Sequence, residues 1–160
     1  MKDRFDRFSY ALTEIYRHWH KIASQVMGEY GLKGSCSVYF TAMRGQKDGL
    51  TASKLSELCG RNKSDVSRMI SQMIQKGFVR KEKVGNKSYR AKLFLTEDGN
   101  RVADHIYERA KVAVDFGGLG LDSQQRDGFF LALELIANNL RMISTECIYK
   151  FGNQPILIEG

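Results

Sequence analysis

The sequence predicts a mainly α-helical protein with one small β-hairpin, and three observations lead to this fold class. Apolar residues recur three and four positions apart over most of the 160 residues, which is the spacing of one face of a helix. Residues 78–95 instead read as two short strands joined at a turn. The basic excess of the chain is confined to the segment that contains this hairpin.

Residues 3–30 are expected to form one long helix. Its apolar residues make a heptad-like stripe of Phe5, Phe8, Leu12, Ile15, Trp19, Ile22, Val26 and Tyr30. Gly31 and Gly34 end this helix, and a second helix is expected at 35–44. The long stripe needs a partner helix, because the segment of about 50 residues that follows is too small to cover it.

The segment 50–76 predicts two helices joined by a tight turn. Thr51 can cap the first helix, which carries Leu55 and Leu58 on its apolar face and ends near Cys59. Gly60 then supplies the left-handed conformation that a sharp stop needs. Asn62 or Ser64 can cap the second helix, which runs to about Lys76. Its apolar positions are Val66, Met69, Ile70, Met73 and Ile74.

Together with the strands predicted at 78–84 and 88–95, these helices form a winged helix-turn-helix. The N-terminal residues of the second helix in such a unit contact base edges in DNA, and a basic wing can reach the backbone or the minor groove. The candidate DNA contacts are Asn62, Lys63, Ser64, Ser67, Arg68 and Gln72 on the helix and Lys83, Asn86, Lys87 and Arg90 on the wing.

The charge distribution supports this prediction. Residues 44–92 hold 13 Lys and Arg against 4 Asp and Glu, whereas the remaining residues hold 12 against 14. The formal charge of +7 therefore comes entirely from the winged segment. Such clustering is what attraction to phosphate requires, whereas a solvated basic face on a structural unit is the alternative.

Residues 50–101 resemble the winged helix of the MarR family of bacterial transcription regulators. The resemblance is carried by LT at 50–51, LSELCGRNKSDVSRMI at 55–70, QKGFVRK at 75–81 and LTEDGNR at 95–101. It implies a homodimer that binds double-stranded DNA, with 64–68 in the position of the recognition helix. The family's wing usually carries an Asp-x-Arg pair, whereas this wing reads GNKSYR at 85–90 and has no acidic residue.

Two further helices are expected after the wing. Thr96 can cap a helix that reaches about Phe116, with Val102, Ile106 and Ala110 on its inner face. Asp122 and Gln125 match a capping box for a last helix that reaches about Thr145. That helix carries a second stripe of Phe129, Leu133, Ile136, Leu140 and Ile143.

The expected domains are 1–44 (N-terminal helices, dimerisation and effector pocket), 45–96 (DNA binding) and 97–160 (C-terminal helices, dimerisation). The terminal helices are expected to form an all-helical dimerisation region, because each has an unpartnered stripe. The packing or order of the tail after Cys147 stays open.

The resemblance also implies a pocket for a small aromatic effector. Aromatic and apolar residues of the first two expected helices could line it, namely Tyr16, Trp19, Tyr39, Phe40 and Met43. The alternative is ordinary core packing, since aromatic residues at helical spacing usually lie in a core.

The three cysteines, Cys36, Cys59 and Cys147, are expected to be reduced thiols. Cys36 lies at a helix start, where a lowered pKa would suit an oxidant sensor. Sensors of the family usually carry the reactive cysteine in the first helix, and this chain has none there.

No motif predicts an enzyme, a cofactor or a metal. His18 and His20 lie two positions apart on a helix, so they point about 200° apart and cannot share one ion with His105. The chain has no run of 18 apolar residues and no apolar signal region, which predicts a cytoplasmic protein.

The function expected from these features is sequence-specific binding of a pseudo-palindromic DNA operator by a homodimer. Repression relieved by an effector is the expected mode of regulation. One alternative is a winged helix that serves as a protein-interaction module without sequence-specific DNA binding. Another, within the regulators, is a cysteine-based redox sensor.

Overall fold

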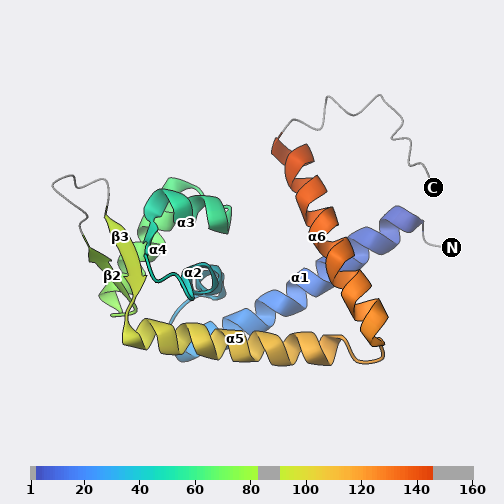
Figure 1. The fold of residues 1–160 in the computed structure, drawn as a ribbon, viewed down its shortest axis with the longest axis horizontal. Helices are drawn as coiled ribbons and strands as arrows, with labels where there is room; N and C mark the ends of the chain where they lie inside the picture. The colour runs from blue at the N-terminus through green and yellow to red at the C-terminus, as the bar shows by residue number, and fades with distance from the viewer. Residues whose placement is uncertain (1–2, 83–90, 146–160) are drawn as a thin grey trace. The chain divides into compact units, whose positions relative to one another are not determined.

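The computed structural model describes residues 3–82 and 91–145 and confirms the predicted fold class. The chain divides into two compact units, one ending at Ala113 and the other beginning at Val114. The first unit contains the helices α1–α4, the three strands and most of α5, and the second contains the end of α5 and α6 (Figure 1).

The long N-terminal helix is confirmed as α1 (Arg4–Glu29). Asp3 caps it, because its side chain accepts a hydrogen bond from the backbone N–H of Arg4. The second predicted helix begins with a 3₁₀ turn, η1 (Gly34–Cys36), and continues as α2 (Ser37–Met43).

The helix-turn-helix consists of α3 (Ala52–Cys59) and α4 (Lys63–Gln75). Thr51 caps α3 as predicted, since its Oγ1 accepts from the N–H of Lys54 at 3.2 Å. Gly60 has φ of 58°, the left-handed conformation that lets the chain turn sharply between the two helices. Of the two predicted caps for α4, Asn62 is the one that caps the helix: its Oδ1 accepts from the N–H of Asp65 at 2.8 Å.

Three antiparallel strands form a small sheet in the order β1-β3-β2. They are β1 (Leu50–Thr51), β2 (Val79–Glu82) and β3 (Lys92–Leu95). The register pairs Val79 with Leu95 and Leu50 with Leu93. The strand β1 was not predicted, and the hairpin tip at 83–90 lies outside the described residues.

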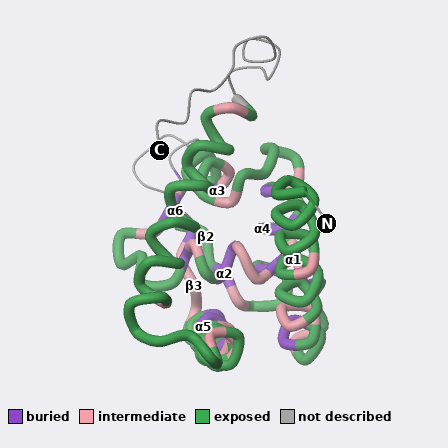
Figure 2. The backbone as a smooth tube through the Cα atoms, turned by 90° about the vertical axis from the view of Figure 1, so that its right-hand side faces the viewer, coloured by how far each residue is buried: buried purple, intermediate pink, exposed green. Residues whose placement is uncertain are grey.

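The core of the first unit is shared by its helices and the sheet. Figure 2 shows buried segments on α1, α2, α4 and the start of α5. The largest fully buried side chains are Met27, Cys36, Tyr39, Phe40, Leu55, Val66, Met73 and Val102. The core thus fixes α4, the candidate recognition helix, through its apolar face.

Two residues expected on apolar faces are exposed. Leu58 is 49% exposed, because it lies about 60° around the helix axis from Leu55, the one buried residue of the short α3. Ile74 is 38% exposed at the margin of the α4 stripe, whose centre lies between Val66 and Met73.

The helix α5 (Glu97–Gly117) starts against the sheet. Thr96 precedes it, and its Oγ1 accepts from the N–H of Gly99 at 3.0 Å. A Cβ at Gly99 would lie 2.0 Å from the carbonyl oxygen of Phe78, so only glycine allows this close approach. Val102 is buried as predicted, and Ile106 is partly buried against the core.

The second unit is dominated by α6 (Ser123–Thr145). Its capping box is confirmed: the N–H of Asp122 donates to Gln125 Oε1 at 3.0 Å, and the N–H of Gln125 donates to Asp122 Oδ1 at 2.8 Å. Its stripe is exposed in the single chain, with Phe129 at 45%, Leu133 at 43%, Ile136 at 37% and Leu140 at 46%. Across residues 3–82 and 91–145, no helix is both long and apolar enough to cross a membrane.

Candidate nucleic-acid interface

One hydrogen-bonded network covers the N-terminal turn of α4. Asn62 Oδ1 accepts from the N–H of Asp65 at 2.8 Å and from Ser64 Oγ at 2.7 Å. Asn62 Nδ2 in turn donates to Asp65 Oδ2 at 2.9 Å. The predicted contacts Asn62 and Ser64 therefore lie together, and they are held by one another and by Asp65.

Arg68 extends this network by one helical turn. A terminal nitrogen of its guanidinium forms an ion pair with Asp65 Oδ1, three residues earlier. The side chain of Arg68 is 75% exposed, while that of Asp65 is 35% exposed. Arg68 therefore lies on the polar face of α4 with its guanidinium held at one edge. Asp65 belongs to this candidate interface, although the sequence prediction did not include it.

The remaining predicted contacts on α4 share the polar face. Lys63 and Ser67 are exposed, whereas Gln72 is only partly exposed. Lys63 and Ser67 line a hollow of about 350 Å³. Residues that the prediction did not include also line it, among them Thr51 and Ser53 at the start of α3, Ser71 on α4 and Lys81 on β2. The hollow thus brings polar groups from α3, α4 and the sheet to one place.

The predicted wing contacts, Lys83, Asn86, Lys87 and Arg90, lie outside the described residues. The strands that carry the wing hold three further cations with different surroundings. Arg80 lies 4.6 Å from the centre of the Phe94 ring and pairs with Glu82. Lys92 donates to the carbonyl oxygen of Asp48 at 2.7 Å, and Lys81 is exposed beside the hollow.

A larger cavity of about 510 Å³ lies between α1, α2 and α5 of the first unit. Of the five predicted effector-pocket residues, only Trp19 lines it. Tyr39, Phe40 and Met43 lie in the core instead, because they occupy the inner face of α2, and Tyr16 is 65% exposed on α1. The face of α2 that meets the cavity carries Val38 and Thr41.

Two arginines stand at this largely apolar cavity. Arg44 Nε donates to Asp104 Oδ1 at 2.9 Å, and its guanidinium lies 4.0 Å from the centre of the Tyr107 ring. Arg44 and Tyr107 both line the cavity, as does Arg109. The cavity therefore combines an apolar wall with positively charged side chains. The sequence could not show this, because α2 and α5 are far apart in the chain.

The surroundings of Cys36 and Cys59 favour the protonated thiol over the reactive thiolate. Cys36 is fully buried, and its Sγ lies 3.7 Å from Met69 Sδ. Burial raises the pKa of Cys36 and also that of Cys59. A raised pKa keeps a thiol protonated near neutral pH, which is the opposite of what an oxidant sensor needs. Cys147 lies outside the described residues.

The histidines have separate surroundings. His105 Nδ1 lies 2.7 Å from the hydroxyl of Tyr30, whereas His18 Nε2 lies 3.6 Å from a carboxylate oxygen of Glu14. His20 lies beside the ring of Tyr16. Within the described parts of the chain, no group of three or more His, Cys, Asp or Glu residues could hold a metal ion.

Comparison with known proteins supports the winged-helix reading. Residues 27–94 match the family described as sugar-specific transcriptional regulator TrmB. No curated protein matches the sequence.

Three solved structures illustrate the similarity of fold. A MarR transcriptional regulator from Methanosarcina mazei Go1 is 20% identical, with a TM-score of 0.74 over 89% of this chain and 95% of that one. A putative MarR family regulator from Listeria monocytogenes, complexed with 26mer DNA, is 21% identical, with a TM-score of 0.77 over 97% and 99%. The S. aureus MepR–DNA complex is 16% identical, with a TM-score of 0.72 over 83% and 96%.

The predicted resemblance to the MarR family is thus confirmed at the level of the fold. Identities this low establish how the chain folds and leave its ligands to be argued from its own residues.

Proposed function

We propose that this chain, which has the winged-helix fold of MarR-type transcription regulators, is a homodimer that binds a specific sequence of double-stranded DNA in the cytoplasm. The observation that carries the proposal is the polar network at the start of α4. It presents Arg68 on the exposed face of the helix whose other face is anchored in the core. An arginine in this position can donate two hydrogen bonds to the O6 and N7 atoms of guanine.

The electrostatics support the same proposal. The segment 44–92 carries the whole positive excess of the chain, and it contains α3, α4 and the strands β1 and β2. Lys63 on α4 and Lys81 on β2 line one hollow together with the start of α3, so a DNA backbone there would meet positive charge from both elements.

We further propose that two copies of the chain pair through their first and last helices. The stripes on α1 and α6 leave large apolar side chains exposed in the single chain, including Phe5 at 72% and Ile15 at 56%. Burying one such side chain contributes roughly 1.5–3 kcal/mol, so two stripes in water would be unfavourable. A two-fold dimer would place two copies of α4 in successive major grooves about 10 base pairs apart.

The cavity between α1, α2 and α5 supports control by a small molecule. Its lining includes Trp19, Ile22, Val26, Ala103 and Ile106, which suit an apolar or aromatic ligand better than a sugar. Arg44 and Arg109 would attract an acidic group on that ligand. The ligand would contact the dimerisation helix α1 as well as α2, so it could shift the spacing of the two recognition helices and relieve repression.

The runner-up is a winged-helix module that binds an acidic protein surface. Both candidates use the basic face, but only the regulator requires a preference for one DNA sequence. The test is a selection of genomic DNA fragments by the full-length protein at rising salt concentration, followed by sequencing. The regulator predicts enrichment of fragments that share an imperfect palindrome, whereas the interaction module predicts retention without sequence preference.

A further inference from the structure

We propose that Asp65 determines the DNA specificity of this protein by fixing the guanidinium of Arg68 in the orientation that reads a base. This inference rests on the DNA-binding function proposed above and adds a positioning residue to it. Asp65 itself would contact no base. It would act through Arg68, which it holds from the same face of α4.

The carboxylate of Asp65 is held by contacts other than the one to Arg68. One oxygen accepts from Asn62 Nδ2 at 2.9 Å, and the other pairs with Arg68. The N–H of Asp65 donates to Asn62 Oδ1, so the residue is tied to the helix cap by its backbone and its side chain. Its two oxygens thus link the cap of α4 to the arginine one turn later.

The Asp65–Arg68 pair contributes little to the stability of the fold, because it is an exposed ion pair. Its larger effect is on the freedom of Arg68, whose long side chain otherwise samples many rotamers. The pair occupies one terminal nitrogen of a planar guanidinium, and the remaining N–H groups keep the fork that matches O6 and N7 of guanine. An arginine without this restraint could bind phosphate as readily as a base.

The charge of Asp65 should also weaken the general attraction to DNA. Non-specific binding consists almost entirely of attraction to phosphate, and a fixed carboxylate on the recognition helix weakens that attraction. This weakening applies to every duplex alike, so it leaves the ratio of specific to non-specific affinity nearly unchanged. The effect of Asp65 on that ratio therefore depends on the orientation of Arg68.

The test measures the affinity of each variant for two duplexes at one salt concentration. One duplex is selected by the wild-type protein from a random pool, and the other is a shuffled duplex of equal composition. The specificity ratio is the first affinity divided by the second. The central variant is Asp65→Ala. The matched control is Glu57→Ala, which removes the same charge from α3 of the same helix-turn-helix, where Glu57 pairs with Lys54 at 3.0 Å. Arg68→Ala and the double variant Asp65→Ala, Arg68→Ala complete a cycle.

We expect Asp65→Ala to lower the specificity ratio by about 10-fold or more, the range of one bidentate base contact. Glu57→Ala should change it by less than about threefold, since it alters only the general attraction to phosphate. In the Arg68→Ala background, the further loss of Asp65 should leave the ratio nearly unchanged. Asp65→Asn keeps the shape of the side chain and should also lower the ratio. It provides a second measurement if the alanine variant does not fold.

Equal effects of Asp65→Ala and Glu57→Ala would overturn the proposal, because charge alone would then explain both. So would an unchanged effect of Asp65→Ala in the Arg68→Ala background, because Asp65 would then act independently of Arg68. A wild-type protein that selects no sequence from the pool would instead refute the proposed function itself, and Asp65 with it.

Discussion

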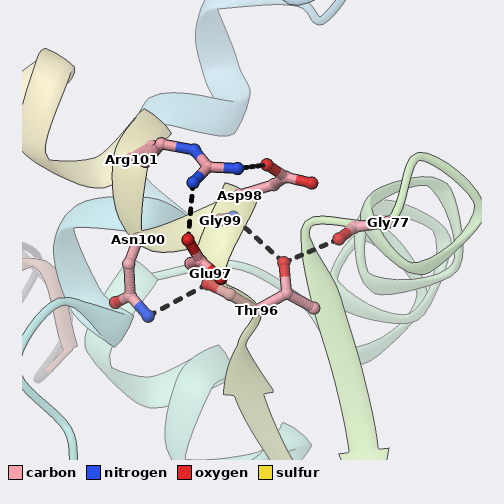
Figure 3. A network of polar contacts seen from close by, with 7 residues as sticks. All are labelled: Gly77, Thr96, Glu97, Asp98, Gly99, Asn100 and Arg101. Atoms are coloured by element: carbon pink, nitrogen blue, oxygen red, sulfur yellow. Dashed lines mark hydrogen bonds and ion pairs between the residues drawn. The ribbon is translucent and has the colours of Figure 1, made fainter.

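The hydroxyl of Thr96 donates a hydrogen bond to the carbonyl oxygen of Gly77 at 2.7 Å (Figure 3). The hydroxyl oxygen of Thr96 also accepts from the N–H of Gly99 at 3.0 Å, so this one side chain makes both contacts. Gly77 follows α4 and Thr96 precedes α5. This hydroxyl therefore joins the end of the candidate recognition helix to the start of the helix that borders the cavity.

The first prediction concerns that joint. Thr96→Ala should lower the free energy of unfolding by about 1–2 kcal/mol, because it removes a helix cap and leaves the Gly77 carbonyl without this donor. Urea denaturation of the full chain measures the change. The control is Thr13→Ala on α1, where the hydroxyl bonds only the Ser9 carbonyl of its own exposed helix face. Thr13→Ala should stay within about 0.5 kcal/mol, and an equal loss in both variants would contradict the role of Thr96.

The second prediction concerns base reading by Arg68. Arg68→Ala should weaken binding to the selected duplex by roughly 1–3 kcal/mol if the guanidinium pairs with a guanine edge. The stability of the variant should change by less than about 0.5 kcal/mol, because the side chain is exposed. Arg7→Ala, which removes the same charge from α1, is the control and should leave the preference for the selected duplex intact. Unchanged affinity of Arg68→Ala would show that α4 reads DNA by other residues.

The third prediction separates an effector-controlled regulator from a redox sensor. Because burial raises the pKa of Cys36, its thiol should react with a maleimide at neutral pH far more slowly in the native protein than in urea. Millimolar peroxide should accordingly leave Cys36 unoxidised in the native protein. Rapid native labelling of Cys36, located by peptide mass spectrometry, would restore the sensor hypothesis.

The raised pKa of Cys36 also predicts how stability depends on pH. The unfolded chain releases the thiol proton above about pH 8.5, while the native chain retains it to higher pH. The native state then binds more protons than the unfolded state, so the free energy of unfolding should fall as pH rises past that value. The stability is fully present at lower pH. Cys36→Ala should show a shallower fall than the wild type, and identical pH profiles would contradict the assignment.

The fourth prediction concerns the dimer. The double variant Ile136→Asp, Leu140→Asp should sediment as a monomer and lose DNA binding, because it would bury two charges in the proposed interface. The control Gln124→Asp, Asn138→Asp adds the same charges to α6 away from the stripe and should remain a dimer that binds DNA. A wild-type chain that sediments as a folded monomer at micromolar concentration would refute the dimer and the paired-groove mechanism.

Local signals predicted most of the fold. The helix ends were predicted correctly at Thr51, at Gly60 and at the Asp122–Gln125 capping box. Such ends are predictable because a cap depends only on residues within one helical turn. Strand β1 was missed because two residues are too short to show alternation, and Leu50 is a strand residue only through its pairing with Leu93. Its existence depends on a contact more than 40 residues away in the chain.

The candidate site was predictable only in part. Helical periodicity put Arg68 on the polar face of α4, but it could not show that Asp65 would hold it, because i, i+3 neighbours pair only in particular rotamers. Periodicity also could not place the residues proposed for the effector pocket. Aromatic residues at helical spacing mark an apolar face, yet periodicity does not say whether the core or a cavity meets that face. Tyr39 and Phe40 meet the core, whereas Val38 and Thr41 of the same helix meet the cavity.

The most direct test of the central claim is a titration of the wild-type protein with two labelled duplexes, measured by fluorescence anisotropy at physiological salt. One duplex carries the sequence selected from genomic fragments, and the other is its shuffled counterpart. Specific recognition by α4 predicts a ratio of affinities of about 10³ or more, with two chains bound to each selected duplex. Equal affinity for the two duplexes would contradict sequence-specific regulation and would favour the protein-interaction module.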